Sequence, residues 1–163
     1  MAGIMVASAF RDPALTAILQ MRNVRKLYGD QVVVDNLDLE VQPGQCYGLL
    51  GPNGAGKTTT LRMLYTLMHP ETGRVQVDGH DTVADAAAVR RVLGVLPDAR
   101  GVYKRLTARE NIEYFGQLQR LSKAQVTQRI GVLAAALQME DFLDRQTEGF
   151  SQGQRTKTAI ARV

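Results

Sequence analysis

Alternating hydrophobic and polar residues predict strands in the first third of the chain. Residues 18–27 alternate loosely, and residues 37–41 alternate strictly before a turn at Pro43 and Gly44. Together these two stretches predict an antiparallel, hairpin-like layer. Residues 46–50 form a short apolar run followed by a glycine, which is typical of a buried parallel strand.

Helical and strand patterns then follow one another up to about residue 96. Residues 57–68 carry apolar side chains at helical spacing and residues 83–91 are rich in alanine, so both stretches predict helices. Between them, residues 75–77 alternate before a turn and predict a short strand. Residues 92–96 predict another buried strand, which Pro97 ends.

The second half of the chain changes to a helical pattern. Three capping boxes, each a Ser or Thr followed three residues later by Glu or Gln, predict helix starts at Thr107 with Glu110, Ser122 with Gln125, and Ser151 with Gln154. The first two boxes precede apolar residues on one helical face, namely Ile112, Phe115 and Leu118, then Val126, Ile130, Leu133 and Leu137. An α/β first half therefore leads into a helical segment from about residue 107 to residue 163.

Length and charge set broad limits on the function. The 163 residues are enough for one domain with a sizeable core, and 20 basic against 16 acidic side chains give a net charge of +4. This mild excess fits an anionic ligand or a lipid surface. No apolar run approaches the roughly 18 residues of a membrane span, and the apolar start of the chain lacks the basic leading region of a signal peptide. We therefore expect a cytosolic protein with a loose extension over residues 1–16, for which a misplaced start codon is the alternative explanation.

The isolated cysteine and histidines add little chemistry. Cys46 is the single cysteine and lies in an apolar run, which predicts a small core residue and no disulfide or metal site. His69 and His80 stand alone beside turn residues, which predicts turn or surface positions.

The strongest chemical signal is the run Gly51-Pro-Asn-Gly-Ala-Gly56-Lys57-Thr58, which matches the phosphate-binding loop pattern Gly-x-x-x-x-Gly-Lys-Ser/Thr. Gly54 and Gly56 allow a tight curl in which backbone N–H groups point at phosphate oxygens. We expect Lys57 to reach the β- and γ-phosphates and the Thr58 hydroxyl to bind Mg²⁺. The run lies between an apolar strand and an amphipathic helix, whose positive N-terminal end favours an anion.

The residues around this loop carry a more specific resemblance. Residues 47–62 resemble the loop of ATP-binding cassette (ABC) proteins, and residues 150–154, Phe-Ser-Gln-Gly-Gln, are similar to that family's signature, usually Leu-Ser-Gly-Gly-Gln. Phe150 and Gln152 depart from the signature, and its other three positions match. The resemblance covers about residues 17–163.

The resemblance implies a set of site residues. Those implied in nucleotide binding are Tyr28, Gly51, Pro52, Asn53, Gly54, Ala55, Gly56, Lys57, Thr58, Thr59, Ser151, Gly153 and Gln154. Tyr28 occupies the position of an aromatic residue that stacks on adenine, and a strand-end tyrosine that only packs is the alternative. Asp98 stands where the family usually has a glutamine that senses Mg²⁺ and the attacking water. Lys57 and Asp98 are therefore the catalytic candidates, and Thr58 and Asp98 are the candidate ligands of Mg²⁺. A loop-capping aspartate is the alternative for Asp98.

The same resemblance implies the fold. It is the α/β core of a P-loop NTPase in an ABC nucleotide-binding domain, with an antiparallel β layer and a helical subdomain. Its parts are residues 17–106 for the α/β core, residues 107–150 for the helical subdomain and residues 151–163 for the signature helix. In this family an aspartate, a glutamate and a histidine that complete the catalytic site follow the signature helix. Because the chain ends at Val163, we expect a partial domain without its C-terminal strands, which binds nucleotide poorly and does not turn it over.

The expected function is that of an ABC transporter ATPase subunit. Residues 98–111 resemble bacterial cassettes that drive export, including sodium extrusion, so sodium ions and drug-like compounds are the candidate cargoes. The family uses ATP and Mg²⁺, pairs head to tail with a second nucleotide-binding domain, and drives a separate integral membrane permease from the inner face of the cell membrane. Nucleic acid is not an expected partner. A soluble ABC-type ATPase without a transport role and a nucleotide-sensing module without turnover are the alternatives.

Overall fold

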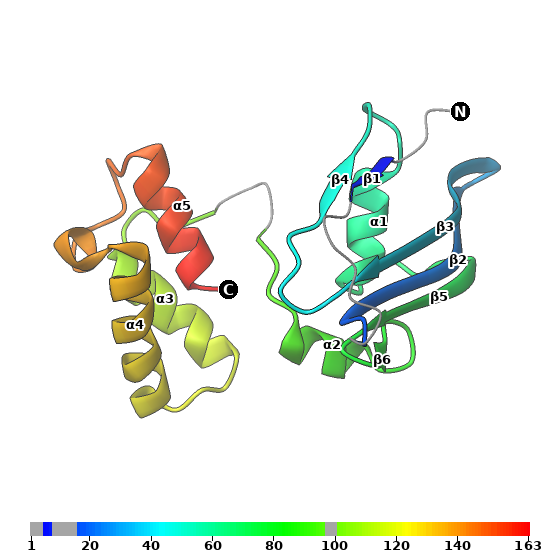
Figure 1. Ribbon diagram of the computed structural model, residues 1–163. Helices are drawn as coiled ribbons and strands as arrows, with labels where there is room; N and C mark the ends of the chain where they lie inside the picture. The colour runs from blue at the N-terminus through cyan, green and yellow to red at the C-terminus, as the bar shows by residue number, and fades with distance from the viewer. Residues whose placement is uncertain (1–4, 8–15, 97–100) are drawn as a thin grey trace. The chain divides into compact units, whose positions relative to one another are not determined.

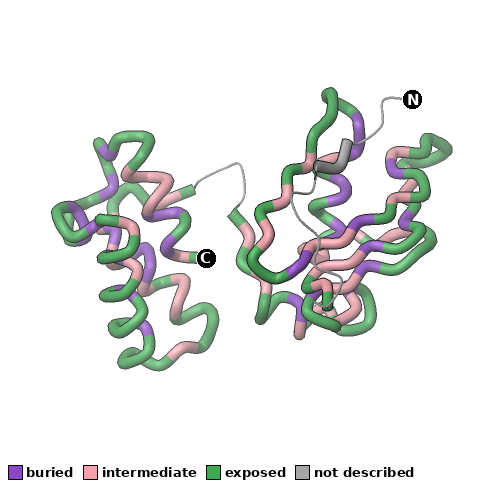
Figure 2. Tube along the Cα trace, viewed as in Figure 1, coloured by how far each residue is buried: buried purple, intermediate pink, exposed green. Residues whose placement is uncertain are grey.

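The computed structural model describes residues 16–96 and 101–163 and, for the backbone alone, residues 5–7. The chain divides into two compact units, Met1–Gly94 and Val95–Val163 (Figure 1). The first unit is α/β and the second is helical, which confirms the predicted fold class. Each unit buries its own cluster of hydrophobic residues (Figure 2).

A four-stranded antiparallel sheet, in the order β3-β2-β5-β6, forms one layer of the first unit. The strands are β2 (Leu19–Tyr28), β3 (Gln31–Val41), β5 (Thr72–Val77) and β6 (His80–Asp81). The predicted hairpin is confirmed, since β2 pairs antiparallel with β3 through a two-residue turn at Gly29 and Asp30. Tyr28 is the last residue of β2 and lies directly before this turn.

The loose alternation of β2 has a structural cause. Met21 lies opposite Leu39 on one side and Val75 on the other, so three buried side chains share one face of the sheet. The register then shifts at Asn23, which has a φ of 48°, and Val24 also enters the core. A strict period of two would have placed Val24 on the opposite face.

Helix α1 (Lys57–Leu64) covers this core from the second layer. Its buried residues Met63 and Leu64 belong to the same hydrophobic cluster as the sheet residues. The helix is shorter than predicted, because Thr66 takes a φ of 65° and the chain leaves the helix before residue 68.

Two strand predictions are wrong, and the first concerns residues 46–50. The observed strand β4 (Gly48–Leu50) has three residues and pairs antiparallel with β1 (Met5–Ala7), not parallel as expected. Leu50 is 53% exposed and Cys46 is exposed too, so the predicted core cysteine is also corrected. Among the described residues β1 is the strand that pairs with β4, and an apolar run alone does not state which neighbours will cover it.

The second correction concerns residues 92–96. Helix α2 (Ala86–Val92) extends through Val92, and the N–H of Leu93 still donates to the carbonyl oxygen of Val89. The first residues of the expected strand are therefore already paired within a helix. Residues 93–96 form no regular structure, and Val92 and Leu96 are 50% and 43% exposed. Pro97 lies outside the described residues.

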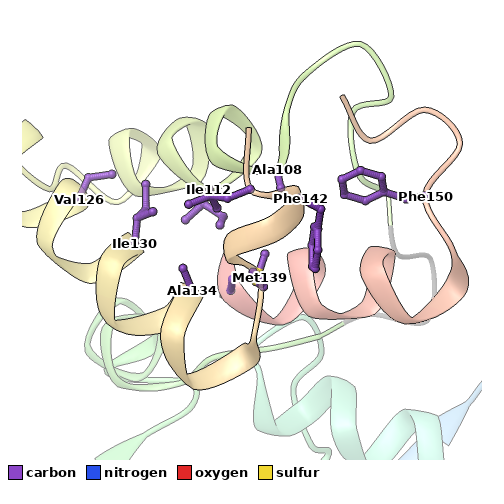
Figure 3. Packing of buried hydrophobic residues seen from close by; sticks show 10 residues of the cluster. Ala108, Ile112, Val126, Ile130, Ala134, Met139, Phe142 and Phe150 are labelled. Carbon is purple, nitrogen blue, oxygen red and sulfur yellow. The ribbon is translucent and has the colours of Figure 1, made fainter. Parts of the chain in front are cut away.

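The second unit consists of α3 (Ala108–Leu118), α4 (Lys123–Leu137), the 3-10 helix η1 (Glu140–Phe142) and α5 (Gln152–Ala161). All three predicted capping boxes are confirmed, with both reciprocal hydrogen bonds present in each. The helices enclose one hydrophobic cluster, made of Ala108, Ile112, Val126, Ile130, Ala134, Met139, Phe142, Leu143, Phe150 and Ala161 (Figure 3).

One predicted member of this cluster, Leu118, is instead 60% exposed. It follows Ile112 by six residues, which rotates it about 120° around the helix from the buried side chain. Gly116 takes the contact with α4, since a Cβ at this position would lie 2.8 Å from a methyl carbon of Val126. Residues three apart are not exactly aligned on a helix, so after two such intervals Leu118 no longer faces the cluster that Ile112 faces.

Candidate nucleotide site

The phosphate-binding pattern forms a tight loop between β4 and α1. Gly54 and Gly56 take φ values of 83° and 89°, which favour glycine. At Gly56 the lack of a side chain is also a packing requirement, because a Cβ would lie 2.6 Å from the carbonyl oxygen of Val33. The loop therefore lies directly against β3 and is held close to the sheet.

The start of α1 is open to an anion. The N-cap Gly56 provides no side-chain hydrogen bond, and the first turn carries no acidic residue. The first amides of the helix therefore lack the side-chain acceptor that usually satisfies them, and the helix dipole adds positive potential there. Thr58 is exposed in this turn, whereas Thr60 is buried and its hydroxyl donates to the carbonyl of Gly56 at 3.0 Å.

Lys57 folds back over the loop that precedes it. Its Nζ donates to the carbonyl oxygens of Gly51 at 2.6 Å and Pro52 at 2.7 Å. The N–H of Ala55 also donates to the Pro52 carbonyl, which closes a turn at 3.2 Å. The ammonium thus lies within the curl of the loop, where it bonds neutral carbonyl oxygens that an anionic oxygen can replace.

Tyr28 lies beside the same helix although it comes from the end of β2. Its hydroxyl donates to the sulfur of Met68 at 3.1 Å and lies 3.5 Å from the hydroxyl oxygen of Thr59. Tyr28 remains 43% exposed, so part of its side chain is open to solvent. The structure therefore brings Tyr28 and Thr59, two predicted nucleotide-binding residues, together.

The signature residues lie at the start of α5. The Ser151 hydroxyl accepts from the Gln154 N–H at 3.2 Å, and the Gln154 side chain accepts from the Ser151 N–H at 3.0 Å. Gly153 is exposed in the first turn. The departure at Phe150 has a packing reason, since its buried ring contacts Phe142 edge-on with centroids 5.3 Å apart (Figure 3).

A family model described as ABC transporter matches residues 34–163 of the chain. The chain belongs to this family. The ABC transporter resemblance seen in the loop and the signature is thereby confirmed over most of the chain.

Curated relatives of this ABC transporter chain are named as ATP-binding proteins. It is 50% identical over 149 residues to the Nod factor export ATP-binding protein I of Cupriavidus metallidurans, covering 91% of this chain and 49% of the relative. It is 45% identical to the ABC transporter ATP-binding protein NatA of Bacillus subtilis, covering 80% and 53%, and 40% identical to the daunorubicin resistance ATP-binding protein DrrA3 of Streptomyces coeruleorubidus, covering 92% and 46%. The chain thus spans about half the length of these relatives.

A solved structure shares the fold of this ABC transporter chain. It is described as the structure of the ATP binding subunit of an ABC transporter, and it superposes with a TM-score of 0.71 at 23% identity. The match covers 90% of this chain and 61% of the solved chain. At this level of identity the comparison supports the fold alone.

Two further expectations concern Asp98 and membrane-spanning helices. Asp98 lies outside the described residues, so its catalytic and metal roles stay predictions. Across residues 16–96 and 101–163, no helix offers the length of apolar residues that crossing a bilayer requires.

Sequence reasoning missed Asn111 in the helical unit of this ABC protein. The side chain is fully buried, and its Oδ1 accepts from the Tyr103 N–H at 2.8 Å. Its Nδ2 donates to the carbonyl oxygens of Thr107 at 2.8 Å and Tyr103 at 3.2 Å. A signal was available, because Asn111 lies one helical turn after the N-cap Thr107 and directly beside the apolar position Ile112.

Proposed function

We propose that this chain supplies the nucleotide-binding part of the ATPase subunit of a bacterial ABC exporter. The observation that carries the proposal is the start of α1. The uncapped amides of the helix, Gly56 and Lys57 all lie there. An anion at this point accepts from several N–H groups and from an ammonium together. A nucleotide triphosphate bound with Mg²⁺ is the ligand that this arrangement suits.

Each loop residue has a role in that proposal. The loop amides bind phosphate oxygens, and Lys57 exchanges its two carbonyl partners for the β- and γ-phosphates. Thr58 provides the hydroxyl that would hold Mg²⁺, with Asp98 as the second proposed ligand. The exposed ring of Tyr28 supplies a flat surface for adenine, and stacking of this kind contributes roughly 1–3 kcal/mol.

The signature residues are proposed to serve a second cassette. Ser151, Gly153 and Gln154 lie at a helix N-terminus, the type of position that favours a phosphate. In a head-to-tail pair, each nucleotide would contact the loop of one chain and the signature of the other. Phosphoryl transfer relies mainly on positioning and charge stabilisation, so this closure would assemble the complete site.

The names of the relatives support an export role, and an export role calls for a membrane partner. Their printed names include Nod factor export and daunorubicin resistance, which favours export of an organic compound or an ion through a separate permease at the inner face of the membrane. We assign the permease contact to residues 98–106. In the described part of this segment, Lys104 and Arg105 are exposed, and neither charge is needed in the core.

The test uses the full-length protein, expressed together with a membrane protein encoded beside its gene. We expect MgATP binding by calorimetry, phosphate release that depends on Lys57, and recovery of both proteins together from detergent. Photocrosslinkers at Lys104 and Arg105 should reach the membrane protein, and a crosslinker at Arg129 on α4 serves as the control. Nucleotide binding without a membrane partner would favour the soluble alternative, and no binding at all would refute the proposal.

A further inference from the structure

Arg162 at the end of α5 makes two contacts that the proposed function does not use. Its Nη1 donates to the carbonyl oxygen of Gly101 at 2.6 Å. Its guanidinium also lies over the ring of Phe115 on α3, with 4.6 Å between Cζ and the ring centroid. One side chain therefore connects α5, α3 and the start of residues 101–107, which we name the anchored segment.

The anchored segment is also bonded to the residues that precede the signature. The N–H of Thr147 donates to the carbonyl of Leu106 and that of Glu148 to the carbonyl of Lys104, both at 3.0 Å. The buried hydroxyl of Thr147 adds a bond to the carbonyl of Tyr103 at 2.9 Å. Thr147 lies only four residues before Ser151, so these bonds fix the chain immediately before the signature.

A third set of bonds fixes the anchored segment from α3. Asn111 bonds both the N–H and the carbonyl of Tyr103, and the Tyr103 ring stacks on Phe115 with centroids 6.3 Å apart. The anchored segment is thus held along its length, and Arg162 is the contact that joins it to the far end of α5.

We propose that Arg162 is a positioning residue of the ABC site. It joins α5 to residue 101 after the signature residues, while Thr147 and Glu148 join the chain before them to the rest of the same segment. Ser151, Gly153 and Gln154 are therefore flanked on both sides by contacts to one stretch of chain. A displacement of that stretch moves Ser151, Gly153 and Gln154 with it as one body. The catalytic part of this inference rests on the proposed function, whereas the anchoring part does not.

The helix offers a matched control in Lys157. Its Nζ donates to the carbonyl of Gln138 at 3.3 Å, so Lys157→Ala also removes a positive charge and one carbonyl bond from α5. This bond reaches the end of α4 and leaves the anchored segment untouched. Arg162→Lys keeps the charge but loses the flat guanidinium over Phe115. Comparison of Arg162→Ala, Arg162→Lys and Lys157→Ala separates anchoring from a general loosening of the helix.

The experiment is amide hydrogen exchange of the full-length protein, first without nucleotide. Arg162→Ala should speed exchange of the amides of Tyr103, Thr147 and Glu148 about tenfold, as expected for the loss of a charged hydrogen bond together with a cation–π contact. Arg162→Lys should recover part of this protection, and Lys157→Ala should leave it within twofold of wild type. Unchanged exchange at all three amides, or equal acceleration throughout α4, would overturn the anchoring.

Turnover then tests the catalytic consequence. In Arg162→Ala we expect kcat for ATP to fall about tenfold while MgATP affinity stays within twofold, because the phosphate loop is not altered. An unchanged kcat despite faster exchange would refute positioning. Failure of the proposed function would give a different result: in the wild-type protein, MgATP would protect no loop amide from exchange and no phosphate would be released. The exchange results without nucleotide would still decide the anchoring.

Discussion

The ammonium of Lys57 lies 2.6 Å from the carbonyl oxygen of Gly51, the first residue of the loop that it is proposed to serve. The side chain is therefore already directed into the loop before any phosphate arrives. Binding exchanges bonds from the ammonium to neutral carbonyl oxygens for bonds to anionic oxygens, which add attraction between opposite charges.

We expect Lys57→Ala to weaken MgATP binding to the full-length protein by about 2 kcal/mol or more, because water replaces a charged hydrogen bond poorly. Titration calorimetry measures this directly. Arg62→Ala on the exposed side of the same helix is the control and should bind as wild type does. Equal affinity in the Lys57 variant would remove the residue from the site.

Tyr28 gives a smaller effect with a distinct pattern. Tyr28→Ala should weaken binding by roughly 1–3 kcal/mol, as for the loss of a base stack. Tyr28→Phe should be nearly silent, since the hydroxyl bonds only the weak acceptor sulfur of Met68 and lies at the limit of contact with Thr59. If the wild type and both variants bind equally, the ring has only a packing role.

Two loop glycines with similar backbone angles should differ in their tolerance of alanine. Gly54→Ala meets open space and should cost only the strain of a positive φ, about 1–2 kcal/mol. Gly56→Ala adds a clash with the Val33 carbonyl and should cost about 1–3 kcal/mol more. Urea unfolding of the full-length variants provides the comparison, and equal midpoints would show that the loop moves away from β3 easily.

Asn111 should be the most sensitive polar residue of the helical unit. Asn111→Leu removes the acceptor of the Tyr103 N–H and one of the donors to the Tyr103 and Thr107 carbonyls, and the loss of the first bond alone should cost about 1–3 kcal/mol. Gln117→Leu, on the exposed side of α3, should change the free energy of unfolding by less than about 0.5 kcal/mol. Two denaturation curves that shift equally would contradict the role of Asn111.

Asp81 should make stability depend on pH in the acid range. Partial burial raises the pKa of Asp81, but the N–H groups of Ala84 and Val83 and the Arg74 guanidinium outweigh it and hold the pKa below that of an ordinary aspartate. Because the folded pKa lies below the unfolded value of about 3.9, the stabilisation is present above that value and is lost as pH falls through the folded pKa.

Thermal midpoints recorded between about pH 2 and pH 6 check this, since Asp81→Asn should remove part of the loss that the wild type shows on acidification. Arg74→Met, which removes one of the three partners, should reduce the loss without abolishing it. Parallel curves for the wild type and Asp81→Asn would contradict the prediction.

Local signals were predicted well because their causes are local. The box of Thr107 with Glu110 depends on residues three apart, and both of its hydrogen bonds form as expected. The loop from Gly51 to Thr58 likewise depends on closely spaced glycines and a helix start. Such features need no information about the rest of the fold.

The failures and omissions come from contacts between residues distant in sequence. The burial of Cys46 depends on which strands flank β4, and an apolar run does not specify them. Tyr28 meets Met68 across 40 positions, and Arg162 meets Gly101 across 61. Hydrophobic periodicity identifies the face of an element, but it does not identify the partner of a single polar atom.

The capping box of α5 has a consequence for sequence tolerance. The side chains of Ser151 and Gln154 each accept from the other residue's main-chain N–H, and the Arg155 N–H donates to the Ser151 carbonyl. The main-chain N–H groups at positions 152 and 153 therefore remain among the donors that the first turn can present to a ligand. A main-chain donor is the same in every amino acid except proline, so Gln152 in place of the family's usual glycine leaves that donor chemically unchanged. A substitution that lowers the sequence similarity to the signature motif can thus leave the chemistry of the motif intact.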